Sequence, residues 1–226
     1  MKGGISYREK NYMLGLSLTT PSINIFGTGN SSLLLSKSNL DVDSLEMIPE
    51  MLSDFQKELR TYYYSPLSIG FGGAYYFKHT SLYFSAEWFN RVNEFSVMKP
   101  RKFVVQSTGE SVEHNVKYSV KGVFNFGFGV KYTFNRNFIF YGSITTDRSA
   151  YDANKSSPLV ISTWDIIHIR SGAEFNYRNL RITLGLGYGY SGELFGRFKF
   201  LGIFENKNTD VIYHQFDIIF GLSYTM

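Results

Sequence analysis

The stretch 122–147, GVFNFGFGVKYTFNRNFIFYGSITTD, decides the fold class of this chain. Large apolar or aromatic side chains stand at every second position from Phe124 to Phe134, and small or polar residues stand between them. A period of two is that of a β-strand with one apolar face and one polar face. The triplet Asn-Arg-Asn at 135–137 interrupts the pattern before aromatic residues resume, which indicates a tight turn between two strands.

The same alternation recurs along nearly the whole chain and predicts nine strands. Most of them are much longer than the roughly 5–6 residues usual in soluble proteins. A tilted strand that crosses a membrane needs about 9–11 residues. The predicted strands are 2–9, 12–26, 62–77, 81–99, 118–134, 138–151, 162–177, 180–196 and 211–226.

The connections between these strands alternate between two kinds. Aromatic residues flank the short ones, as in the belts that mark a membrane interface. Short turns at one end and long loops at the other are typical of outer-membrane barrels, with the turns periplasmic and the loops extracellular. The short turns are 10–11, 78–80, 135–137 and 178–179, and the long polar connections are 27–61, 100–117, 152–161 and 197–210.

These patterns predict an all-β fold, an antiparallel transmembrane β-barrel in the outer membrane of a Gram-negative cell. The alternative is a soluble β-sandwich whose aromatic residues pair across strands. The mean hydropathy of −0.15 and the absence of any run of 18 apolar residues argue against transmembrane helices. An average this polar is compatible with barrel strands, because their residues alternate.

Composition narrows the chemistry that the chain can perform. Cysteine is absent, which removes disulfides, thiolate zinc sites and a cysteine nucleophile. The net charge of +4 is spread along the chain without a basic stripe, so no nucleic-acid partner is expected. The four histidines, His79, His114, His168 and His214, show no metal-binding spacing. We expect no cofactor, no metal and no enzymatic activity. The alternative is an outer-membrane hydrolase that uses His214 at the outer rim.

The predicted strand count is odd, whereas bacterial single-chain barrels have even counts. An open edge in lipid would leave backbone groups unpaired at several kcal/mol each. We therefore expect residues 1–226 to be one barrel domain that forms the C-terminal part of a larger barrel, unless one strand is miscounted.

Strand parity also predicts a lumen face that is rich in glycine and carries the charged side chains. Charge facing lipid at the midplane costs about 2–4 kcal/mol, whereas charge facing the lumen is tolerated. Two uses are open: mutual ion pairing, or contact with a ligand headgroup or gate. The predicted inward charges are Glu87, Arg91, Lys131, Asp147, Arg170, Glu174, Arg181 and Asp217, with His168 beside them.

Two segments, GLSLTTPSINIFGTG (15–29) and YYYSPLSIGFGGAYYFKHTSLYFSAEWFNRV (62–92), resemble the FadL/TodX family of outer-membrane transporters for hydrophobic compounds, especially its Bacteroidetes members. The resemblance rests on Thr-Thr-Pro-Ser at 19–22, Ser-Pro-Leu at 65–67 and Ala-Glu-Trp-Phe at 86–89. It implies a barrel of 14 strands with an N-terminal plug, of which this chain supplies nine strands. It also implies that the loop 27–61 carries a helix beside a surface groove for hydrophobic ligands.

The segment PEMLSDFQKEL at 49–59 fits such a helix. Pro49 suits a first helical position. Met51, Leu52, Phe55 and Leu59 would share one apolar face. Packing on the barrel rim is the plain interpretation of that face, and a ligand groove is the functional one.

The sequence thus predicts a channel for passive uptake of hydrophobic or amphipathic small molecules, such as long-chain fatty acids. The alternatives are a scaffold for surface or secreted proteins and a general porin. The expected partners are outer-membrane lipid and lipopolysaccharide, a hydrophobic small-molecule ligand, and, for the scaffold, a surface protein.

Overall fold

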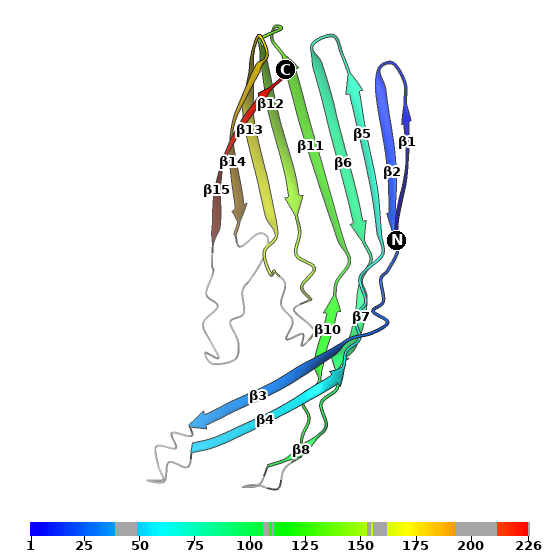
Figure 1. Cartoon of the computed structure of the whole chain (residues 1–226), viewed down its shortest axis with the longest axis vertical. Coiled ribbons are helices and arrows are strands. Elements are labelled where there is room, and N and C mark those ends of the chain that lie inside the picture. The colour runs from blue at the N-terminus through cyan, green and yellow to red at the C-terminus, as the bar shows by residue number, and fades with distance from the viewer. Residues whose placement is uncertain are drawn as a thin grey trace.

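The computed structural model describes residues 1–38, 49–105, 109, 111–152, 155, 162–192 and 212–225. Every named element in these ranges is a β-strand, and every pairing is antiparallel. Nine strands form one sheet whose edge strands, β1 and β15, are not paired with each other (Figure 1). In spatial order the nine are β1 (Lys2–Arg8), β2 (Tyr12–Thr19), β5 (Ser68–Tyr76), β6 (Thr80–Phe89), β11 (Val123–Thr133), β12 (Phe138–Asp147), β13 (Ile166–Tyr177), β14 (Leu180–Ser191) and β15 (Tyr213–Tyr224).

All nine predicted strands are confirmed. Each lies within its predicted range, except that β6 begins at Thr80, one residue before the predicted start. Several are shorter than predicted. The predicted strand 62–77 begins only at Ser68. The predicted strand 81–99 divides into β6 and a separate strand, β7 (Val92–Met98), and the predicted strand 118–134 divides into the end of β10 (Val116–Val120) and β11. The predicted extension of the eighth strand to 196 lies outside the described residues.

The short turns are confirmed, and their hydrogen bonds explain why these residues turn. The Asn135 side-chain oxygen accepts hydrogen bonds from the backbone N–H of Asn137 and of Phe138, both at 2.8 Å. Such an Asx turn holds the chain without help from the neighbouring strands. In the β13–β14 turn, Arg178 takes the left-handed conformation with φ 53.

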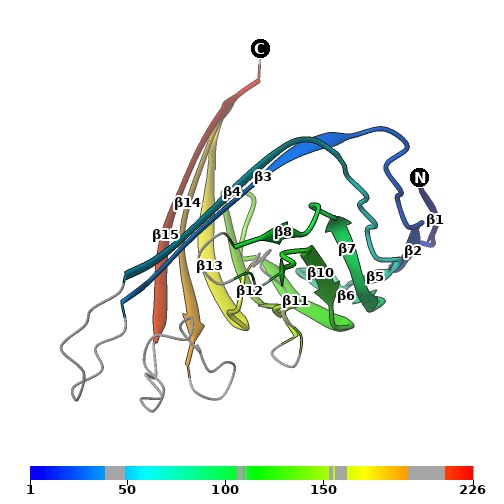
Figure 2. The same ribbon diagram turned by 90° about the horizontal axis from the view of Figure 1, so that it is seen from below.

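The register separates two faces across all nine strands. Phe128 of β11 lies opposite Phe84 of β6 and Ile144 of β12, and this row continues to Ile169 of β13. One residue further along, Gly127 lies opposite Ser85 and Thr145. The sheet curves strongly (Figure 2). We call the apolar side the convex face and the small, polar side the concave face.

The convex face exposes large apolar side chains rather than burying them. Phe124, Phe126 and Phe128 are 43–49% exposed, and Ile218 of the edge strand is 83% exposed. Among the described residues the buried hydrophobic side chains are few: Leu52, Ala74, Val105, Tyr118, Val120 and Val123. The sheet therefore has almost no apolar core of its own. No helix in the described ranges is long and apolar enough to span a membrane.

Three smaller two-stranded sheets extend from the end of the nine-stranded sheet opposite the tight turns (Figure 1). They are β7 with β10 (Val116–Val120), β3 (Thr28–Ser38) with β4 (Pro49–Arg60), and β8 (Phe103–Val104) with β9 (Ser111–Val112). The Tyr118 ring of β10 packs against Tyr63 and against Phe95 of β7, with ring centroids 5.6 and 5.7 Å apart.

The predicted helix at 49–59 is wrong, because these residues form β4, which pairs with β3 in a long hairpin arm. In a strand, Leu52 and Phe55 lie on opposite faces, and Leu52 is buried while Phe55 is 57% exposed. Leu59 is half-buried, and the side chain of Met51 lies outside the described part of the chain. The four residues therefore do not share one apolar face.

The packed face of β4 carries polar side chains that bond to neighbouring segments, which explains why β4 is a strand. The Gln56 side-chain amide donates to the backbone oxygen of Arg101 at 2.8 Å and accepts from its N–H at 2.7 Å. Asp54 accepts from Gln56 at 2.7 Å and lies 3.3 Å from His114. Leu52, Asp54 and Gln56 alternate with exposed Ser53, Phe55 and Lys57, so the period is two.

Candidate functional site: the concave face

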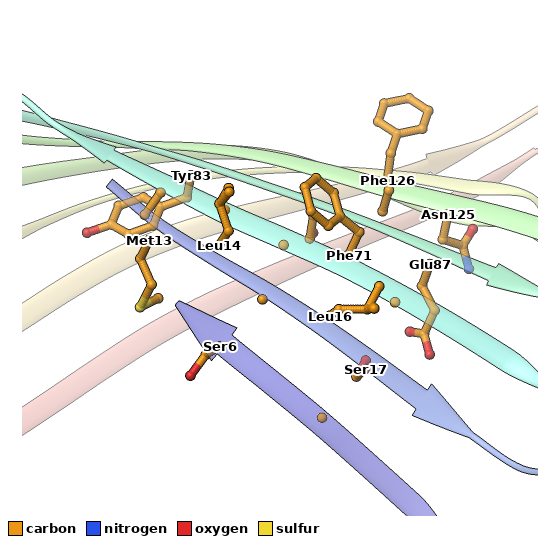
Figure 3. A pocket seen from close by; sticks show the side chains of 18 of the residues that line it. Ser6, Met13, Leu14, Leu16, Ser17, Phe71, Tyr83, Glu87, Asn125 and Phe126 are labelled. Carbon is orange, nitrogen blue, oxygen red and sulfur yellow. The ribbon is translucent and has the colours of Figure 1, made fainter. Parts of the chain in front are cut away.

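The part of the concave face on β1, β2, β5 and β6 is lined mainly by small residues. A cavity of about 660 Å³ lies against these strands and β11. Gly15, Gly70 and Gly72 line it together with Ser17 and Ser85. Figure 3 shows Met13 and Glu87 pointing to one side of this sheet, and Phe71 and Phe126 pointing to the other.

Space in this half results from the absence of side chains. A Cβ added at Gly72 would come no closer than 3.7 Å to any neighbouring atom, and one at Gly15 no closer than 3.9 Å. The charged residues that line the cavity are Lys2, at the start of β1, and Glu87, near the end of β6. Glu87 accepts a hydrogen bond from the Ser68 hydroxyl at 3.1 Å. We call this half of the concave face the neutral half.

The other half, on β12 to β15, is held by a network centred on Glu174. Its carboxylate accepts hydrogen bonds from the Tyr141 hydroxyl and the Asn176 amide, both at 3.0 Å. Arg181 lies 3.3 Å from the same carboxylate and donates to Asn176 at 3.1 Å. Glu174 is 8% exposed, so its charge is stabilised by these three donors rather than by bulk water.

A second group of charges lies further from the tight turns on the same strands. Asp217 lies 3.7 Å from the Arg170 guanidinium and accepts a hydrogen bond from Gln215 at 2.8 Å. Arg170 also lies 3.5 Å from His168 Nδ1. The Arg170 and Asp217 side chains are 36% and 28% exposed, so they remain accessible. We call this half of the concave face the charged half.

The structure thus brings together five of the predicted polar residues and leaves others apart. His168, Arg170 and Asp217 form one group, and Glu174 forms another with Arg181. Lys131 stands over the Tyr141 ring, 6.0 Å from its centroid. Glu87 lies in the neutral half, and Arg91 is exposed in the link between β6 and β7.

Sequence reasoning missed the neutral polar members of the charged half. Tyr141, Asn176 and Gln215 bond the carboxylates directly, yet only charged residues and His168 were predicted to matter. Parity was the available signal for Tyr141, which alternates with Phe138 and Phe140 on the convex face. Among the described residues, no cluster of three or more His, Asp or Glu side chains is placed to hold a metal ion.

Comparison with known proteins finds a likeness to solved structures, at low sequence identity. No family model matches the sequence, and no curated protein matches it. A solved structure of a TodX monoaromatic hydrocarbon channel, in its deltaS2 mutant, is 15% identical with a TM-score of 0.48. The match covers 98% of this chain and 47% of that one, so this chain spans about half of its length. At this TM-score the likeness carries no functional weight.

Proposed function

We propose that the nine-stranded sheet is part of the wall of an outer-membrane β-barrel that conducts hydrophobic or amphipathic small molecules, such as long-chain fatty acids. The observation that carries the proposal is the two-sided sheet: apolar side chains on the convex face and small or polar side chains on the concave face.

The convex face favours lipid as its surroundings. Each fully buried large apolar side chain contributes about 1.5–3 kcal/mol when it leaves water. Dozens of such side chains are exposed on this sheet, and a soluble monomer rarely exposes a contiguous apolar patch beyond a few hundred Å². Contact with hydrocarbon removes the free-energy cost of exposing these side chains to water. Aromatic pairs near the tight turns, such as Tyr7 with Tyr12 and Tyr75 with Phe77, suit an interfacial belt.

The concave face favours an amphipathic cargo. The neutral half offers room along glycines for an apolar chain, and the charged half offers hydrogen-bonding groups at the same level of the wall. A ligand with a tail and a polar head could contact both halves at once. Passage down a concentration gradient would require no cofactor.

The hairpin arm favours a second candidate function, docking of a surface protein. Leu34 and Phe55 are 65% and 57% exposed on this arm. The arm projects from the end of the sheet opposite the tight turns (Figure 1). In a transport role the same exposed side chains would meet incoming hydrophobic ligand.

The membrane assignment is tested by two substitutions on opposite faces of β11. Phe126→Arg places a charge on the convex face and should prevent folding into bilayers, at a cost of about 2–4 kcal/mol near the midplane. Gly129→Ser places a hydroxyl on the concave face, where the new Cβ would have only ordinary contacts at 3.7–3.8 Å. Folded protein is measured by heat-modifiable gel mobility after reconstitution of the full-length protein.

Equal folding of both variants would remove the membrane proposal. Transport is then tested separately, by uptake of a fluorescent long-chain fatty acid into vesicles that contain the wild-type protein. Folded protein with no uptake above empty vesicles, together with a stable protein complex that Phe55→Ala disrupts, would leave the docking function.

A further inference from the structure

A second cavity of about 240 Å³ lies at the end of the sheet from which the long connections emerge. Three segments form it: the end of β10, the chain that follows β12 and the chain that precedes β13. It is separate from the concave cavity and shares no lining residue with it. The polar and aromatic residues of its wall are Ser119, Asp147, Arg148, Tyr151, Ser162 and Trp164.

Ser119 is the feature of this pocket that needs an explanation. The side chain is 6% exposed, and its Oγ has no hydrogen-bond partner within the described ranges. Tyr118 pairs with Phe95 and Val120 with Val92, so Ser119 lies opposite a bulge in β7. Bulges re-aim side chains and are frequent next to functional sites. A buried hydroxyl without a partner costs folding free energy unless a bound molecule completes its hydrogen bonds.

The rest of the pocket wall is already bonded and therefore preorganised. The Ser149 N–H donates to the Asp165 carboxylate at 2.6 Å, and the Tyr151 N–H donates to Ser149 Oγ at 3.0 Å. Ser149 Oγ donates in turn to the Ser162 backbone oxygen. The Trp164 ring packs against Tyr213 of β15, with centroids 5.7 Å apart. Just after β10, the Lys121 N–H donates to the Ala150 backbone oxygen at 2.9 Å. Together these contacts hold the three wall segments in place before any ligand arrives.

The groups that remain available are chemically mixed. Ser119 offers a hydroxyl, Asp147 a carboxylate and Arg148 a guanidinium, and the two charged side chains form no ion pair with any described residue. Acceptor, donor and hydroxyl together suit a neutral ligand rich in hydroxyl groups. Tyr151 and Trp164 add aromatic surface with polar edges. The volume lies below the roughly 300–1,000 Å³ of sites for drug-sized molecules, which suits a single ring.

We propose that this pocket binds one pyranose ring of a carbohydrate, with the Ser119 hydroxyl bonded to a sugar hydroxyl and an aromatic ring against the C–H face. The opposite charges of Asp147 and Arg148 balance, which disfavours a phosphate or a simple cation. The sugar can belong to the glycan of lipopolysaccharide or to a diffusible saccharide, and the two sources are separated experimentally.

The chain's tryptophan content makes the test direct, because it contains only Trp88 and Trp164. In full-length protein in which every other tryptophan, Trp88 included, is replaced by phenylalanine, the fluorescence of Trp164 reports on the pocket. The probes are methyl glycosides of glucose, galactose and mannose, lipopolysaccharide with core sugars, and lipid A without them. At least one glycoside should change the Trp164 emission saturably. Core-bearing lipopolysaccharide binding where lipid A does not would assign a membrane glycan, and binding of glycosides alone would assign a diffusible saccharide.

Two variants and a matched control locate the binding. Ser119→Ala removes the hydroxyl without adding volume and should weaken glycoside affinity about fivefold, the equivalent of one ordinary hydrogen bond. Asp147→Asn removes a charge at an exposed position and should weaken it without loss of folding. Ser191→Ala is the control, since Ser191 is also fully buried with an unpartnered Oγ but does not line the pocket. No saturable response to any probe, or an unchanged glycoside affinity in both Ser119→Ala and Asp147→Asn, would overturn the proposal.

Discussion

The neutral and charged halves of the concave face share the same alternation along their strands, but they place different side chains on that face. In the neutral half, glycine and serine leave a cavity against β1, β2, β5, β6 and β11, and Glu87 has one hydrogen-bond donor, Ser68. In the charged half, Glu174 has three donors and Asp217 has two partners. In the channel that we propose, the neutral half would provide space for an apolar ligand chain, and the charged half would provide stability and polar selectivity.

The largest expected effect comes from comparing the two glutamates. Glu174→Ala leaves Tyr141, Asn176 and Arg181 without their shared acceptor, and we expect a loss of about 2–3 kcal/mol in the free energy of unfolding. Glu87→Ala removes a single hydrogen bond and should cost about 0.5–1.5 kcal/mol. Urea unfolding in lipid vesicles measures both. Equal losses would erase the distinction between the halves.

A smaller effect is expected from two glycines of the concave face. A Cβ at Gly172 would lie 2.8 Å from the Leu184 backbone oxygen, so Gly172→Ala should force backbone movement. Overpacking of this kind costs about 1–3 kcal/mol. A Cβ at Gly72 would lie 3.7 Å from the Phe84 backbone oxygen, so Gly72→Ala should leave the melting temperature nearly unchanged. Equal destabilisation by Gly72→Ala would show that the neutral half is packed rather than open.

The smallest effect on stability is expected at Arg170 and Asp217. Both side chains are partly exposed, and their charged groups lie 3.7 Å apart. Exposed ion pairs of this kind contribute about 0–1 kcal/mol to stability. Arg170→Met should therefore barely change unfolding, but it removes a cation from the wall. Uptake of an anionic fatty acid should fall relative to the uncharged alcohol of the same chain length. An unchanged ratio would mean that the charged half does not contact the ligand head.

The nine strands could be predicted because each carries its own evidence. Alternation from Phe124 to Phe134 and the Asn135 turn are local features, and local chemistry is sufficient to form a hairpin. Parity also placed the charged residues on one face. It could not assign partners across strands, because Tyr141 reaches Glu174 only through the register of β12 and β13, and Arg181 only through the pairing of β13 and β14.

The hairpin arm was mispredicted for an equally physical reason. Leu52, Phe55 and Leu59 have the spacing of a helical face, whereas the true packed face of β4 contains Asp54 and Gln56. Polar residues at packed positions hide the period of two that a strand normally displays. Their partners, Arg101 and His114, lie far along the chain and cannot be identified from the arm's own sequence.

The two edges of the nine-stranded sheet differ in how they would behave in water. β1 is short and carries Lys2 and Arg8, and charged residues on a short edge discourage pairing with other chains. β15 has 12 residues, with Asp217 as its acidic residue, and Phe216, Ile218, Phe220 and Leu222 are 63–83% exposed. A long apolar edge is a template for ordered aggregation, with strands stacking about 4.7–4.8 Å apart. Without lipid, growth of such fibrils should therefore begin at β15 rather than at β1.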